Sequence, residues 1–360
     1  MSAIASSSTV PRPLRLGILG AGGLGKGMAQ LAQYRPDFQL VALADSRGYC
    51  VDPQGICVDT LLPLPTVAHY QRDTVTGVPT ENAIIDMLKA HASDIDVLFW
   101  ALPNLPVEFF ATTLTHVLDE TKFRGVCVDA LKRTKAVENL MPLAPRLTQE
   151  NMLYITGAGA TPGFLTTLAT VAAHSFVEVL SVDIHFGVGI ACWDQYKATI
   201  REDLLHVPGF TADSVAAMSD AEIEAELAKR NGLLELHNME HADDIILELA
   251  GICPRERVTV GGLVDTQRAQ KPVSTTVTIT GKTFRGTVGS HKVVLSDETT
   301  MVDNVCGPAL GFLLRGWEQA QSGRAGLVTS ADIMPRFAST PVTHLNLPSP
   351  MTQDTTPATV

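Results

Sequence analysis

LRLGILGAGGLG, residues 14–25, is the stretch that decides the fold of this chain. Its apolar first half predicts a buried strand, its glycines predict a turn, and residues 26–34 have helical composition. In such a turn Gly20 permits the sharp bend, Gly22 lets a pyrophosphate approach the backbone, and Gly25 lets the helix pack closely on the strand. The helix N-terminus then offers free N–H groups to phosphate. The alternative is a glycine turn with no ligand. We predict a dinucleotide site formed by Gly20, Gly22, Gly23, Leu24 and Gly25.

The next apolar run, at 39–44, ends at Asp45, 20 residues beyond Gly25. A carboxylate at this position can bind the ribose hydroxyls of NAD, whereas Ser46 and Arg47 can hold the 2′-phosphate of NADP. The sequence does not choose between the two cofactors. We expect the chain to accept both, with NADP slightly preferred.

Farther along, apolar runs alternate with helix-like segments. Strands are predicted at 39–44, 96–101, 125–128 and 152–156, and helices at 81–90, 107–118 and 136–148. This alternation is typical of a doubly wound parallel sheet, and apolar runs without strict alternation fit strands that are covered on both faces. We therefore expect an α/β fold with a Rossmann domain over residues 13–160.

The pattern changes after about residue 175. Long, partly alternating runs at 177–188, 258–264, 273–280 and 282–295 predict strands of an antiparallel sheet, and helices are predicted at 220–230 and 234–249. These segments predict a second, α+β substrate domain over 161–300. A helical segment at 301–337 is expected to pack back on the first domain, and residues 1–12 and 338–360 are expected to be disordered tails.

The composition excludes several classes of protein. The chain has 360 residues, with 27 basic against 38 acidic residues and a formal net charge of −11, and no basic cluster is interleaved with aromatics. Nucleic-acid binding is therefore not expected. The six cysteines are scattered without a C-x-x-C pair, and no apolar run approaches the ~18 residues of a membrane span. We expect a cytoplasmic protein with reduced thiols and no membrane contact.

Polar residues also follow two later strands. Leu102, Pro103 and Asn104 come after the strand at 96–101, and Asp129 and Lys132 come after the strand at 125–128. Ligands of doubly wound sheets lie beyond the carboxyl ends of the strands. Leu102, Pro103 and Asn104 then line the nicotinamide side, or they form an ordinary turn.

Two readings of Lys132 remain open on position alone. A lysine in a basic loop is more often a solvated charge than a nucleophile. A nucleophilic lysine must be neutral, which nearby Arg133 favours; Asp129 opposes it unless that carboxylate contacts the cofactor ribose.

Nine motifs together resemble the BioU family of biotin-synthesis enzymes. In chain order they are GILGAGGLG, LVALADSRGY, ALPNLP, VDALKRT, GATPGFLT, FGVGIACWDQYKATIRED, NMEHADDIILELAG, RVTVGGLVDT and NVCGPA. The resemblance runs from about Leu14 to Phe337, and a more distant likeness links the chain to saccharopine and homoserine dehydrogenases.

The resemblance implies a single-turnover reaction at Lys132. The amine of this residue condenses with the 7-ketone of 8-amino-7-oxononanoate, and NAD(P)H reduces the imine. The 8-amino group is then carboxylated by CO2 from bicarbonate. Oxidation by NAD(P)+ and hydrolysis release the carbamate of 7,8-diaminononanoate, which passes on to dethiobiotin synthesis. Lys132 is left as the aldehyde allysine, so the chain itself is the nitrogen donor.

Other residues have a functional and a plainer interpretation. His237 to His241 match H-x-x-E-H, a zinc pattern on a helix, but no third ligand is apparent and we expect no metal. The resemblance implies that His241 handles protons or stabilises the carbamate during carboxylation; otherwise it is a hydrogen-bonded core residue.

Three more residues are candidates for the substrate. Thr161 is a predicted helix N-cap on a loop that can cradle the substrate carboxylate or the cofactor. Tyr196 can donate to the ketone oxygen, and Arg201 can bind the substrate carboxylate. The plainer interpretations are a close-packed turn, a packed ring, and an ion pair of Arg201 with Glu202 or Asp203.

Two rival functions follow from the same features. One is a conventional multiple-turnover amine dehydrogenase of the saccharopine type, in which Lys132 acts as acid and base. The other is an NAD(P)-binding sensor without chemistry. The sequence does not fix the oligomeric state, and a homo-oligomer is compatible with it.

Overall fold

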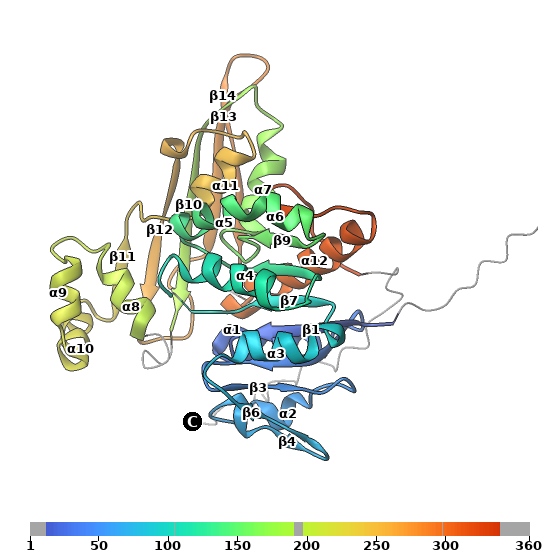
Figure 1. Cartoon of the computed structure of the whole chain (residues 1–360). Coiled ribbons are helices and arrows are strands. Elements are labelled where there is room, and N and C mark those ends of the chain that lie inside the picture. The colour runs from blue at the N-terminus through green and yellow to red at the C-terminus, as the bar shows by residue number, and fades with distance from the viewer. Residues whose placement is uncertain (1–11, 104, 191–196, 297, 339–360) are drawn as a thin grey trace, which may run out of the picture.

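The computed structural model describes residues 12–103, 105–190, 197–296 and 298–338. The two predicted tails therefore lie almost wholly outside the described residues, as do Asn104 and Tyr196. Two large sheets organise the chain, and Figure 1 shows the second sheet rising beyond the β9 side of the first.

The first sheet has eight strands and is mainly parallel. Its order is β15 (Gly326–Thr329), β9 (Leu153–Thr156), β8 (Val126–Asp129), β7 (Val97–Trp100), β1 (Leu14–Leu19), β2 (Phe38–Ala44), β3 (Gly48–Val51) and β6 (Val78–Pro79). The pairs from β15 to β2 are parallel, and β3 and β6 continue the sheet as antiparallel strands. The chain order reverses between β1 and β7, which is where a doubly wound sheet binds its ligand.

Helices cover both faces of this sheet. On one face lie α1 (Gly23–Ala32) and α12 (Met301–Gln321), and on the other α3 (Ala83–His91), α4 (Phe109–Glu120) and α5 (Thr134–Leu140). β8 illustrates why the strands are apolar throughout: Val126 and Val128 are buried in the first core, and Cys127 between them is buried in the second. Such double burial explains the absence of alternation in the sequence.

The second sheet has five strands. Its order is β11 (Leu233–Leu236), β12 (Val258–Asp265), β10 (Glu178–Gly189), β13 (Thr275–Lys282) and β14 (Val288–Leu295). The antiparallel sheet of the prediction is confirmed, with the addition that β10 and β12 pair in parallel. α7 (Phe164–Ala173) packs on this sheet.

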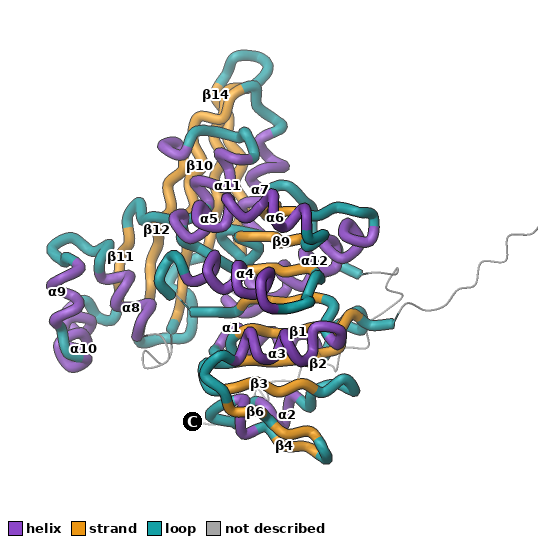
Figure 2. The backbone as a smooth tube through the Cα atoms, in the orientation of Figure 1, coloured by secondary structure: helices purple, strands orange, loops and turns teal. Residues whose placement is uncertain are grey.

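Smaller elements complete the chain. Figure 2 shows α8 (Lys197–Leu204), α9 (Ala212–Ala217) and α10 (Asp220–Lys229) grouped beside β11 at one end of the second sheet. The others are α2 (Val58–Leu61), α6 (Ala144–Gln149), α11 (Asp243–Leu249) and the hairpin of β4 (Gln71–Arg72) and β5 (Val75–Thr76).

Two predicted helices differ from the structure. The helix expected at 234–249 is a strand, β11, a loop and the short helix α11, because Leu234 and Leu236 alternate with an exposed residue and Asn238 adopts a positive φ of 40°. The helix expected at 136–148 is divided into α5 and α6. Pro142 and Pro145 lie at this division, where their missing N–H groups end the regular ladder.

The C-terminal segment joins the first sheet. α12 packs so tightly on it that a Cβ at Gly316 would lie 2.8 Å from side-chain atoms of Val126 and Ile155. Residues 326–329, which fall in the segment expected to be helical, form the edge strand β15 beside β9.

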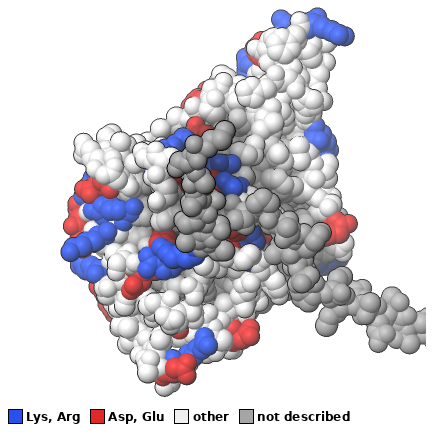
Figure 3. Space-filling model, turned by 90° about the vertical axis from the view of Figure 1, so that its right-hand side faces the viewer, with Lys and Arg blue, Asp and Glu red and all other residues white. Residues whose placement is uncertain are grey.

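The surface carries mixed charge on the face that Figure 3 draws, where Lys and Arg side chains are interspersed with Asp and Glu. Within the described residues no helix is both long and apolar enough to cross a membrane.

Candidate active site

The glycine turn between β1 and α1 leaves an open cradle. Gly20 has a φ of +107°, and a Cβ there would lie 2.3 Å from the carbonyl oxygen of Ala101. A Cβ at Gly25 would lie 1.7 Å from the carbonyl oxygen of Gly20. Gly22 is different, because a Cβ there would meet nothing within 4 Å. Packing thus requires Gly20 and Gly25, whereas the space at Gly22 is open to a ligand.

The start of α1 suits a diphosphate. The helix has no acidic residue in its first turn and no side chain that caps its N-terminal N–H groups. Gly22 and Gly23 are exposed and Leu24 is half-buried. These residues can hold the phosphates of a dinucleotide through backbone N–H groups.

Asp45 is occupied with backbone groups at the end of β2. Its Oδ1 accepts hydrogen bonds from the N–H groups of Arg47 (2.7 Å) and Gly48 (3.0 Å), and its Oδ2 accepts one from Val67 (2.7 Å). Ser46 and Arg47 are exposed on the turn that Asp45 holds. The carboxylate therefore organises this turn and presents an arginine beside it.

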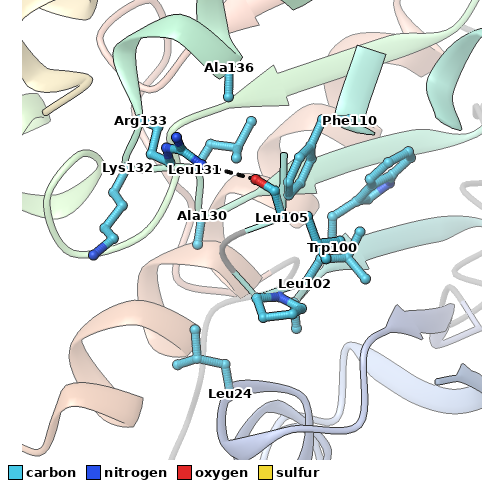
Figure 4. Close-up of a pocket in the computed structure, with 12 residues that line it drawn as sticks. Leu24, Trp100, Leu102, Leu105, Phe110, Ala130, Leu131, Lys132, Arg133 and Ala136 are labelled. Carbon is cyan, nitrogen blue, oxygen red and sulfur yellow. Dashed lines mark hydrogen bonds between the residues drawn. The ribbon is translucent and has the colours of Figure 1, made fainter. Parts of the chain in front are cut away.

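A pocket joins the cofactor turn to the lysine loop. Leu24, Leu102 and Pro103 line it together with Lys132, on the loop after β8 (Figure 4). In Figure 4 the Lys132 side chain extends away from Trp100 and Phe110. The pocket thus brings together three of the strand ends that the sequence singled out.

The amine of Lys132 faces the second half of the chain. Its Nζ lies 3.8 Å from Oε2 of Glu202 on α8, and Oε1 of the same carboxylate lies 3.6 Å from Nε of Arg133. Arg133 also donates a 3.0 Å hydrogen bond to the carbonyl oxygen of Leu105. The side chain of Lys132 is 27% exposed, so the amine is accessible yet held beside an anion.

The lysine loop is pinned by the segment that precedes α11. Ala242 N–H donates a 2.8 Å hydrogen bond to the carbonyl oxygen of Lys132, and Lys135 N–H donates one of 3.1 Å to Oε1 of Glu240. Thr134 Oγ1 donates one of 2.8 Å to Oδ1 of Asp244. α11 itself contributes side chains to the cores of both sheets, so the loop is anchored between the two halves.

The position of Asp129 does not support the expectation that it contacts ribose. It is fully buried, and its Oδ1 accepts hydrogen bonds from the N–H groups of Leu131 (3.0 Å) and Gly157 (2.7 Å). Burial raises the pKa of Asp129 to about 6, although these hydrogen bonds oppose the rise. Its role is to hold the lysine loop against the loop after β9.

His241 belongs to a buried hydrogen-bond network. Its Nδ1 lies 2.7 Å from Oδ2 of Asp243, which also accepts a 2.6 Å hydrogen bond from Thr161 Oγ1. Thr166 Oγ1 donates to the other oxygen of Asp243. Asp243 therefore orients the imidazole and ties it to the start of α7.

Two sequence interpretations of this region are wrong. Thr161 is not the N-cap of α7, because Gly163 occupies that position and Thr161 bonds to Asp243 instead. His237 and His241 do not share a helical face, because they lie in the loop between β11 and α11; His237 is 68% exposed and His241 4%. Among the described residues no group of three or more His, Cys, Asp or Glu side chains is arranged to hold a metal ion.

Arg201 holds α8 to its neighbours. Its Nη2 lies 2.6 Å from Oδ1 of Asp220, and its Nη1 donates hydrogen bonds to the carbonyl oxygens of Val215 (3.2 Å) and Met218 (3.0 Å). The plainer interpretation, a structural ion pair, is closer to the structure, with Asp220 as the partner. Tyr196 and Asn104 lie outside the described residues.

Sequence reasoning missed Glu202 and Asp203 as neighbours of Lys132, and Asp243 as the partner of His241. Glu202 and Asp203 were considered only as ion partners of Arg201. The available signal was that both residues lie in one motif with Arg201, which was itself a candidate. The sequence could not show which side of α8 faces Lys132, because that depends on how the two halves of the chain pack.

Comparison with known proteins decides the family. No family model matches the chain. The (S)-8-amino-7-oxononanoate synthase BioU of Haloferax mediterranei is 35% identical over 353 residues, covering 90% of this chain and 99% of that protein. The chain belongs to the BioU family. A match that covers 90% of the chain includes residues of both sheets.

Solved structures share the fold of this BioU-family chain at low sequence identity. An engineered D-amino acid dehydrogenase bound to NADP+ has a TM-score of 0.52 and 16% identity, covering 89% of this chain and 94% of that one. The DAP dehydrogenase of C. glutamicum has a TM-score of 0.52 and 17% identity, covering 90% and 95%. Saccharopine dehydrogenase of Saccharomyces cerevisiae has a TM-score of 0.53 and 10% identity, covering 88% and 94%. The fold is therefore that of Rossmann dehydrogenases with a second domain.

Proposed function

We propose that this chain is a single-turnover enzyme of biotin synthesis that converts 8-amino-7-oxononanoate to the carbamate of 7,8-diaminononanoate. The nitrogen comes from the amine of Lys132. The observation that carries the proposal is the pocket that Lys132 lines together with Leu24, next to the glycine turn, because the reaction needs an amine and a hydride carrier in one site. The name of the Haloferax relative supports 8-amino-7-oxononanoate as the reacting compound.

The cofactor in this proposal is NADP or NAD. When bound, it supplies a hydride to the imine carbon and later removes one from the lysine side of the same nitrogen. Gly22 and Gly23 hold its diphosphate, and exposed Arg47 favours the 2′-phosphate of NADP.

Lys132 attacks the ketone through its neutral amine. The loop is fixed by the Ala242 hydrogen bond and by Asp129, so the side chain alone moves to reach the substrate. Glu202 stands beside the amine and stabilises the positive charge that the nitrogen carries as an iminium. Arg133 is held by Leu105 and Glu202 and keeps that carboxylate in place.

His241 handles the proton of the carboxylation step. CO2 from bicarbonate adds to the 8-amino group, and the nitrogen must lose a proton as the carbamate forms. An imidazole whose Nδ1 is oriented by Asp243 can accept that proton at Nε2. The carbamate then passes to dethiobiotin synthesis.

Product counting tests the proposal against its rivals. The protein is incubated with 8-amino-7-oxononanoate, NADPH and bicarbonate, and product is measured per chain. Product that stops at one per chain supports the proposal. Product well beyond one per chain identifies a multiple-turnover dehydrogenase, and cofactor binding without product identifies a sensor. Formation of 8-amino-7-oxononanoate in place of its consumption would also contradict the proposal.

A further inference from the structure

Asp203 is a buried carboxyl group on which the charge of Lys132 acts. It lies near the end of α8, one residue after Glu202, and only 4% of it is exposed. No hydrogen bond among the described residues reaches its carboxyl oxygens. Burial raises the pKa of Asp203 to about 6; the charge of Lys132 opposes this rise and the charge of Glu202 adds to it. A buried carboxyl without a hydrogen-bond partner is costly, and such groups occur mainly where function requires them.

Lys132 and Glu202 are the charges that act on Asp203, and the further charged groups next to these two come from three segments of the chain. Lys132 and Arg133 approach from the loop after β8, Glu202 and His206 flank Asp203 on and after α8, and Glu240 lies before α11. Burial lowers the pKa of His206, with Lys132 adding to this effect and the two glutamates opposing it. The lowered pKa disfavours a charged His206, and Lys132 is the cation whose charge acts on Asp203.

Asp203 and Glu202 differ in the contacts that their carboxyl groups make near the Lys132 amine. The two oxygens of Glu202 lie 3.8 Å from Lys132 and 3.6 Å from Arg133, so this carboxylate serves as the shared counter-ion of two cations. Within the part of the chain that the structure describes, the Asp203 carboxyl group has Lys132 as its one cation and receives no hydrogen bond. No contact among the described residues joins the side chain of His241 to the amine of Lys132.

We propose that Asp203 is the group that takes the proton from Lys132 and returns it during imine formation. This inference rests on the proposed function, in which Lys132 attacks a ketone.

The proton balance of the step is complete without another reactant. The ammonium of Lys132 gives one proton to the carboxylate of Asp203, which leaves a neutral amine and a neutral carboxylic acid. The amine nitrogen forms a bond to the ketone carbon, and one of its protons moves to the former carbonyl oxygen. Asp203 donates its proton to that hydroxyl, the C–O bond breaks, and water leaves. The resulting iminium has the same charge as the starting ammonium, so Glu202 faces a cation before and after the step.

Trapping of the imine tests the assignment without NADPH. The full chain is mixed with 8-amino-7-oxononanoate, samples are reduced with borohydride over time, and the peptide that contains residue 132 is quantified by mass spectrometry. We expect Asp203→Asn to slow the appearance of the adduct at pH 7 by about 100-fold, a usual loss for a missing acid–base group. Asp203→Glu is expected to restore part of the rate. Asp213→Asn, on an exposed position of α9, is the matched control and is expected to react like the wild type.

The pH profile separates a proton-transfer role from a structural one. The wild-type rate is expected to rise with pH through a step near 6, the pKa of Asp203, because the carboxylate is the reactive form. The profile of Asp203→Asn is expected to lack this step, while its unfolding temperature and NADPH affinity stay near those of the wild type.

Three outcomes would overturn the assignment. They are an Asp203→Asn rate equal to the wild-type rate, a step near pH 6 that persists in this variant, and a wild-type profile without the step. An absence of any adduct on wild-type Lys132 would overturn the proposed function as well, so the two failures are distinguishable.

Discussion

The N–H of Ala242 donates a 2.8 Å hydrogen bond to the carbonyl oxygen of Lys132. This bond joins the loop after β8 in the first sheet to the segment between β11 and α11 in the second half. Ala242 directly follows His241, whose imidazole is held by Asp243, so the bond links the backbone of Lys132 to the segment that carries this histidine. The two halves of the chain therefore meet at the residue on which the proposed reaction depends.

Lys132→Arg is expected to abolish product formation. The guanidinium stays protonated and cannot form an imine, but it keeps the charge that faces Glu202, so the fold should be preserved. Product is measured by mass spectrometry after incubation with substrate, NADPH and bicarbonate. Lys135→Arg, which changes an exposed lysine three residues away, is the control and should retain full yield. Product from Lys132→Arg would remove the lysine from the mechanism.

Two glycine substitutions in one turn should affect different properties, one the affinity for NADPH and the other the stability of the fold. Gly22→Ala adds a methyl group where nothing lies within 4 Å, so the chain should fold normally but bind NADPH about tenfold more weakly, or ~1.4 kcal/mol. Gly25→Ala places a Cβ 1.7 Å from the carbonyl oxygen of Gly20 and should destabilise the fold by about 1–3 kcal/mol. NADPH fluorescence titration and urea unfolding measure the two quantities. Unchanged NADPH affinity in Gly22→Ala would argue against a diphosphate at this turn.

Asp243→Asn should lower both stability and carbamate yield. The carboxylate is fully buried and receives hydrogen bonds from Thr161 and Thr166 while it orients His241. The amide cannot accept at both ends, so at least one buried partner is left unpaired, at a cost of about 1–3 kcal/mol. Urea unfolding gives the stability, and trapping of the carbamate gives the yield. If His241 is only a core residue, stability will fall and the carbamate yield per folded chain will not.

The burial of Asp129 should give the protein a pH-dependent stability. Burial raises the pKa of this group from 3.8 to about 6, so the folded chain holds the proton more tightly than the unfolded chain. The resulting stabilisation is complete below pH 3.8 and is lost as the pH rises through 6. Asp129→Asn has no proton to lose, and its amide keeps an oxygen for the N–H groups of Leu131 and Gly157. Its free energy of unfolding should therefore fall less steeply with pH across this window.

Urea unfolding at a series of pH values checks this prediction. Asp203 has a raised pKa for the same main reason and titrates in the same window, so part of the slope should remain in Asp129→Asn. Asp96 does not interfere. Although burial opposes it, hydrogen bonds from Arg12 and Arg15 lower the pKa of Asp96 to about 2, so its contribution is lost only as the pH falls below 3.8. Equal slopes for wild type and variant would show that Asp129 is not protonated in this range.

Much of the first sheet could be predicted from the sequence because its signals are local. Leu14–Leu19 is apolar at every position but one. Of the glycines that follow, Gly25 is required by a contact within the same turn and Gly20 by a contact with Ala101. Two features were not predicted: the division of one helix into α5 and α6, and the strand β15. The first depends on two prolines within an otherwise helical pattern, and the second on pairing with β9, which lies more than 150 residues earlier in the chain.

The candidate site could be predicted in part. Lys132 and the glycine turn follow strands directly, so their edge of the sheet is fixed by topology. The environment of the lysine could not be predicted, because Glu202 and Asp203 reach it only through the packing of α8 across the two halves. Asp129 was misassigned for a related reason: it ends a strand, but its side chain points into the core and not toward the cofactor.

The mass of the peptide that contains residue 132, measured after one complete reaction, tests the central claim most directly. The protein is incubated with 8-amino-7-oxononanoate, NADPH and bicarbonate until product formation stops, and is then digested and analysed. The account predicts an aldehyde in place of the Lys132 amine, in an amount equal to the product released, with Lys135 unchanged. An intact amine at Lys132 in chains that have released product would contradict it.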